Sequence, residues 1–123
     1  MFTITLDDSG LNFQGLKGRA KTLGKIALRS GGMLVANRAK EIITEKGLIK
    51  SGTMKRSIHA EPVENESGDL SVRIGTNIQT PPYPFYLEFG TKRMSPKPFL
   101  RPALDESRDE ALKEVGEVLK RLF

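Results

Sequence analysis

The sequence contains no cysteine and a single histidine, and these absences exclude several kinds of protein. Without cysteine the chain forms no disulfide, no thiolate nucleophile and no thiolate metal site, as is typical of a protein made in a reducing cytoplasm. No apolar run approaches the roughly 20 residues that cross a bilayer, and the first residues lack the pattern of a signal peptide. We therefore expect a soluble protein that is neither exported nor inserted in a membrane.

The residue patterns of common active sites are also missing. His59 is the only histidine, and no Gly-x-Ser-x-Gly motif surrounds a serine. Gly90-Thr91-Lys92 lacks the glycine five residues earlier that a phosphate-binding loop requires. The acidic residues between Glu61 and Asp69 lack the spacing of a calcium loop. We expect a protein that is not an enzyme and uses no metal or cofactor.

The chain is long enough for one domain, residues 1–123, which would bury roughly two thirds of its unfolded surface. Its net charge of +5 is unevenly spread, because residues 13–60 carry eleven lysines and arginines against two glutamates. Within this region Lys17, Lys21, Lys25 and Arg29 form an i, i+4 row. The row indicates either a solvated helix face or a contact with DNA phosphates or an acidic partner. No aromatic residue is interleaved for base stacking, so we expect no sequence-specific readout.

Apolar periodicity predicts two long helices, one from about residue 12 to residue 46 and one from Pro102 onward. Gly47 suits the C-cap of the first helix. Two adjacent glycines, Gly31-Gly32, interrupt its pattern at a cost of about 2 kcal/mol relative to alanines. We therefore expect either a bend there or the close packing of another backbone.

Alternating residues predict two strands, 57–63 and 70–74, that pair antiparallel through a polar loop. Phe2, Ile4 and Leu6 indicate a further strand at the N-terminus, and residues 87–91 a short one. The expected fold class is α+β, with the long N-terminal helix and the C-terminal helix packed on a small antiparallel sheet.

Aromatic residues, prolines and one glycine are concentrated between Tyr83 and Leu104. Four prolines restrict this backbone, so the segment loses less entropy on ordering than an ordinary loop. The composition indicates a docking surface. The candidate subunit-interface residues are Tyr83, Phe85, Tyr86, Glu88, Phe89, Gly90, Thr91, Met94, Phe99, Leu100 and Arg101.

Three of these residues have alternative interpretations. Phe99 and Leu100 are either core residues or anchors in a neighbouring subunit. Glu88 is either an exposed residue on a strand or a buried carboxylate, which would need compensation for its lost hydration. In the buried case the candidate partners are the side chains of Arg93, Lys97 and Arg101.

The same segment carries a family resemblance. It reads Tyr-Pro-Phe-Tyr-Leu-Glu-Phe-Gly-Thr at residues 83–91, then Met94, then Lys-Pro-Phe-Leu-Arg-Pro-Ala-Leu at residues 97–104. This pattern resembles the hallmark of the tail-completion or head-to-tail joining proteins of long-tailed double-stranded-DNA phages. Residues 48–58 are similar to a second motif of that family, with Leu48 and Lys50 in place of its usual proline and aspartate.

The resemblance implies a non-enzymatic virion structural protein that is made in the host cytoplasm and located at the neck or tail end. It implies a homo-oligomer, expected to be a ring around the DNA path, with tail-tube and neck proteins as partners and passing DNA as a candidate non-specific contact. Composition alone leads to an alternative, a small basic nucleic-acid-binding module in which the row at Lys17, Lys21, Lys25 and Arg29 holds phosphates.

Overall fold

The computed structural model describes residues 2–6, 18–47, 53–64, 66, 70–76 and 83–122, without the side chains of 2–6, 53–54 and 83–85. The elements follow the order β1 (Phe2–Leu6), α1 (Arg19–Lys46), α2 (Thr53–Ser57), β2 (Ile58–Glu64), β3 (Leu70–Thr76), α3 (Tyr83–Phe89) and α4 (Leu100–Leu122). The predicted α+β class is confirmed.

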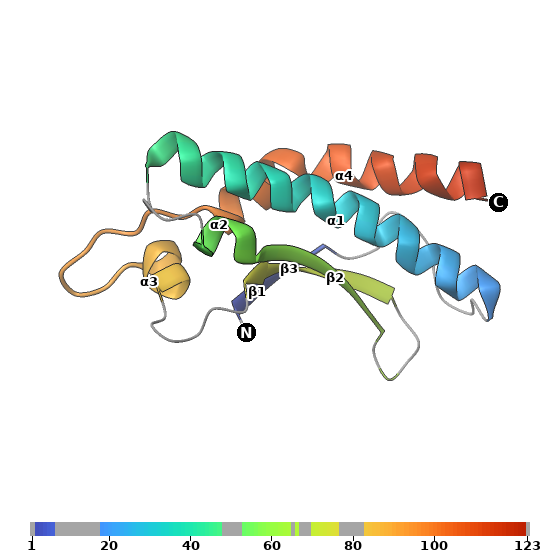
Figure 1. Cartoon of the computed structure of the whole chain (residues 1–123), viewed down its shortest axis with the longest axis horizontal. Coiled ribbons are helices and arrows are strands. Elements are labelled where there is room, and N and C mark those ends of the chain that lie inside the picture. The colour runs from blue at the N-terminus through green and yellow to red at the C-terminus, as the bar shows by residue number, and fades with distance from the viewer. Residues whose placement is uncertain are drawn as a thin grey trace.

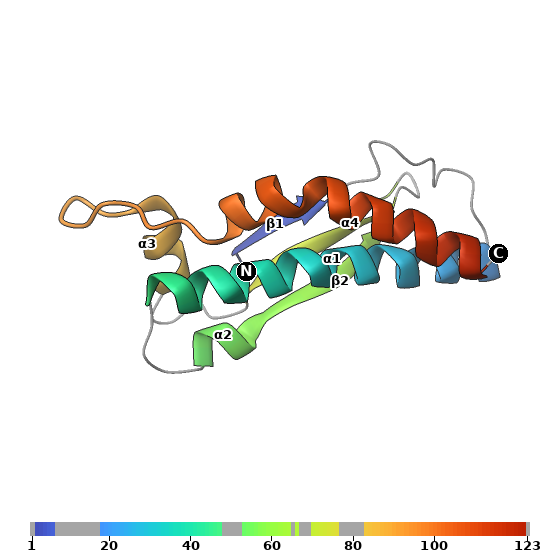
Figure 2. The same ribbon diagram turned by 90° about the horizontal axis from the view of Figure 1, so that it is seen from above.

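The molecule has two layers (Figure 1). The three strands form an antiparallel sheet in the order β1-β3-β2, with Ile74 of β3 opposite Ile4 on one side and Ala60 on the other. The long helices α1 and α4 lie side by side on one face of this sheet, α1 over β2 and β3 and α4 toward β1 (Figure 2). Both the predicted hairpin and the predicted N-terminal strand are confirmed.

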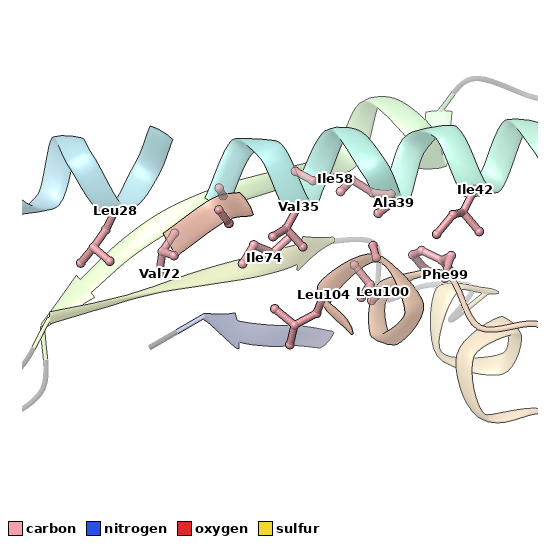
Figure 3. Packing of buried hydrophobic residues seen from close by; sticks show 14 of the residues in the cluster. Leu28, Val35, Ala39, Ile42, Ile58, Val72, Ile74, Phe99, Leu100 and Leu104 are labelled. Carbon is pink, nitrogen blue, oxygen red and sulfur yellow. The ribbon is translucent and has the colours of Figure 1, made fainter. Parts of the chain in front are cut away.

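The hydrophobic core lies between the helix layer and the sheet. The buried positions of α1 recur every three or four residues, as expected of a helix with one apolar face. Leu28, Val35 and Ile42 point from α1 toward the sheet and the start of α4 (Figure 3). Alternate residues of β3 from Leu70 to Thr76 are buried, whereas Arg73 between them is exposed. This alternation is that of an antiparallel sheet covered on one face.

The helix α1 continues without a break through Gly31 and Gly32. The two glycines allow other elements to pack closely against two sides of this helix. A Cβ atom at Gly31 would lie 2.5 Å from Cγ2 of Val115 and 2.8 Å from the carbonyl oxygen of Ala111, both in α4. At Gly32 it would lie 2.7 Å from Cγ2 of Val72 in β3. Of the two explanations that the sequence left open, close packing is therefore the one observed.

We expect Gly31→Ala to lower the free energy of unfolding by roughly 1 to 3 kcal/mol, because the added methyl group forces α1 and α4 apart. Gly116→Ala in α4 is the matched control, since a Cβ atom there would meet no atom of another described element within 4 Å. The control should raise the free energy of unfolding by about 0.5 to 1 kcal/mol, as a helical glycine is replaced by alanine. Urea unfolding measures both, and equal shifts in the two variants would contradict the packing argument.

The prediction of a strand at residues 87–91 is wrong. Residues Tyr83–Phe89 form the helix α3, with Pro84 in its first turn, where the missing N–H group has no helical partner in any case. The C-terminal helix is confirmed, but α4 begins at Leu100, two residues before the predicted start, and its first turn contains no acidic residue. Gly47 is confirmed as the C-cap of α1.

Candidate functional site

A loop projects from one end of the molecule between α3 and α4 (Figure 1). We call residues 90–98 the arm. Its base is closed by a hydrogen bond of 2.7 Å from the N–H of Lys97 to the carbonyl oxygen of Leu87. Toward the tip, the N–H groups of Thr91 and Met94 each donate to the carbonyl oxygen of the other, at 2.9 and 3.3 Å. The arm is therefore a closed turn held by its own backbone.

Gly90 is the point where α3 turns into the arm. Its φ angle of 76° lies in the left-handed region, which side chains disfavour. A Cβ atom there would also lie 2.8 Å from the carbonyl oxygen of Met94 and 2.9 Å from the ring of Pro96. Both the conformation and the space therefore require glycine at this position.

Glu88 joins α3 to the first residues of α4. Its side chain is buried, and its carboxylate accepts hydrogen bonds from the N–H groups of Phe99 at 3.1 Å, Leu100 at 2.8 Å and Arg101 at 3.3 Å. These groups begin a helix, where N–H groups lack helical acceptors and negative charge is favourable. The interpretation of Glu88 as a buried carboxylate is confirmed, but its described partners are backbone amides and not the expected cationic side chains.

The aromatic residues of the segment divide into core and surface. Phe99 and Leu100 are fully buried, which corrects their assignment as interface anchors in favour of the alternative core role. Phe89 and Tyr86 are 58% and 42% exposed. Met94, within the arm, is half-buried and packs against the core.

Several other expected interface residues can also be placed. Thr91 is exposed and forms part of the arm, where residues 91–96 line a shallow hollow of about 350 Å³. Arg101 is exposed at the start of α4, and its guanidinium lies 3.6 Å from the carboxylate of Asp105. The side chains of Tyr83 and Phe85 lie outside the described residues.

The arm itself is strongly basic. Lys92, Arg93 and Lys97 are exposed, and no acidic residue occurs between residues 90 and 98. Within the part of the chain that the structure describes, none of the three forms an ion pair. Sequence reasoning considered Arg93 and Lys97 only as partners of Glu88 and did not identify the three cations as one exposed cluster, although their spacing in the sequence shows it.

The basic row on α1 is partly neutralised within the subunit. The carboxylate of Glu64, at the end of β2, lies 2.5 Å from Nζ of Lys21 and 3.7 Å from Nζ of Lys25. The hydrogen bond from Lys21 is the main cause of a lowered pKa of Glu64. Arg29 is exposed, and Lys17 lies outside the described residues. Two of the four proposed phosphate contacts therefore already have an acidic partner.

His59 has an ordinary structural role. Its Nδ1 lies 2.8 Å from the carbonyl oxygen of Ser57, which can only accept, so Nδ1 carries a proton and donates it. Among the residues that the structure describes, no group of three acidic, histidine or cysteine side chains is placed to hold a metal ion. None of the described helices is long and apolar enough to span a membrane.

Comparison with known proteins gives one finding. Residues 8–90, about two thirds of the chain, match the model of the HK97-gp10-like family, which is described as a bacteriophage HK97-gp10 tail component. The match includes α1, the hairpin and α3, and it ends at Gly90 where the arm begins. Searches among curated proteins and among solved structures gave no match.

Proposed function

Because the chain belongs to the HK97-gp10-like family of phage tail components, we propose that it completes the tail and joins it to the head. In this proposal the protein is a structural subunit of the virion. It assembles as a homo-oligomer, a ring at the neck or tail end, and offers one surface to the tail tube and another to the neck proteins. Its action is mechanical and involves no catalysis.

The observation that carries the proposal is the surface formed by α3 and the arm. It combines exposed aromatic side chains, Tyr86 and Phe89, with exposed cations, and such residues dominate the binding energy of protein interfaces. Glu88 and Gly90 hold this surface in one conformation before any partner binds. A surface that is already ordered loses less entropy when it docks.

Particles made without this protein test the proposal. A phage genome that lacks the coding sequence should produce filled heads and finished tails that remain separate in electron micrographs. Wild-type protein supplied in trans should restore joined particles, and protein carrying both Tyr86→Ala and Phe89→Ala should restore far fewer. Normally joined particles in the absence of the protein would refute the joining role.

A further inference from the structure

The subunit carries two exposed surfaces, one basic and one with an excess of carboxylates over cations. The first is the tip of the arm, where Lys92 and Arg93 are adjacent and exposed. The second is one face of α4. Its residues Glu110, Lys113, Glu114 and Glu117 follow helical i, i+3, i+4, i+7 spacing and so lie on one side of the helix.

The face of α4 is hollowed. A cavity of about 220 Å³ is lined by Leu34 of α1 together with these four residues of α4. Glu114 lies 3.6 Å from the guanidinium of Arg121. Glu110 and Glu117 have no ion-pair partner among the described residues, although other carboxylates of α4 do. Glu106, for instance, accepts a 2.6 Å hydrogen bond from Arg38.

This hollow fits a long basic side chain. The apolar side chain of Leu34 can pack against the methylene stem of a lysine or arginine. The three carboxylates of the lining, which outnumber the single ammonium group of Lys113, can meet its charged head. An arginine suits such a site best, because its planar guanidinium pairs with carboxylates in two-bond geometry. The arm presents such a side chain, Arg93, beside a second cation.

The arm of a subunit does not reach its own hollow. It projects past the N-terminal end of α4, whereas the hollow lies ten or more residues along that helix, roughly 15 Å or more from its start. The arm points away from the helix in both views (Figures 1 and 2). The arm of a second copy of the chain, in contrast, can reach the hollow and carries the matching charge.

We propose that the arm of one subunit docks into the α4 hollow of a second copy, with Lys92 and Arg93 against Glu110 and Glu117. This proposal rests on the assembly role proposed above, and it specifies the two surfaces through which the subunits bind each other. Because the contact joins two different patches, it repeats head to tail, and such contacts close into rings when the rotation between subunits permits. It also predicts that assembly weakens with salt.

Charge exchange tests the contact. An arm variant carries Lys92→Glu and Arg93→Glu, and a face variant carries Glu110→Lys and Glu117→Lys. The matched control carries Lys55→Glu and Arg56→Glu, the same residue pair at exposed positions of α2. Sedimentation velocity over a range of protein and salt concentrations measures self-association, and thermal melts show that each variant is folded.

We expect each of the first two variants to self-associate about tenfold or more weakly than the wild type, because like charges then face each other. Mixing them should restore association, since every acidic arm then finds a basic face and every basic arm an acidic one. The control should behave as the wild type.

Three results would overturn the contact: a wild type that stays monomeric, an arm variant that associates normally, or a mixture that remains dissociated. None of these would refute the joining role, which the particle assay tests separately. Conversely, normally joined particles without the protein would refute that role even if the isolated subunits associate as expected.

Discussion

Phe99→Ala should lower the free energy of unfolding by roughly 3 to 5 kcal/mol, as the truncation of other buried aromatic residues does. Phe99 has no exposed surface and points toward Ile42 of α1 at the point where the arm enters α4 (Figure 3). Its loss leaves a cavity between the two helices, which surrounding side chains fill only in part. Urea unfolding of the isolated subunit measures the effect.

Phe89→Ala is the matched control, because it removes the same side chain from a position that is 58% exposed. Its free energy of unfolding should stay within about 1 kcal/mol of the wild type. Its effect should appear in assembly and in particle joining. If instead Phe99→Ala melts as the wild type does and Phe89→Ala unfolds easily, the division of this segment into core and surface is wrong.

Glu88→Ala should lower the free energy of unfolding by roughly 3 to 4 kcal/mol, since three N–H groups at the start of α4 lose their acceptor. Glu88→Gln keeps one accepting oxygen without the charge and should lose about half as much. Glu117→Ala removes an exposed carboxylate near the other end of α4 and should change the free energy of unfolding little.

Amide hydrogen exchange distinguishes a local from a general effect of Glu88. In Glu88→Ala the N–H groups of Leu100 and Arg101 should exchange faster than those in the middle of α4, because the first turn opens without its acceptor. Equal stability of Glu88→Ala and Glu117→Ala would show that the buried carboxylate does not hold the helix.

The long elements were predictable because their patterns repeat. Residues 19–46 and 100–122 each present apolar side chains on one helical face over several turns, and the hairpin strands alternate around a polar loop. The helix α3 is shorter than two turns, so no period could be read from it. Its aromatic residues, which favour strands, led to the wrong prediction.

The candidate site was only partly predictable for a different physical reason. Glu88 bonds to amides eleven to thirteen residues further along, and backbone amides leave no mark in a sequence. Side-chain cations nearby were the only visible candidates. In the same way, Gly31-Gly32 suited a bend and a close contact equally well. Only the folded structure, in which Val115 and Ala111 lie against Gly31, shows that the close contact is the correct explanation.

The closed base of the arm separates its tip from the rest of the fold. The bond from Lys97 to Leu87 and those from the start of α4 to Glu88 lie below the tip. Of residues 92–95, only Met94 packs against the core, and the other three side chains are exposed. The exposed side chains of Lys92, Arg93 and Ser95 can therefore be exchanged without unfolding the subunit. The tip of the arm can in this way present different side chains to a partner while the scaffold beneath it stays unchanged.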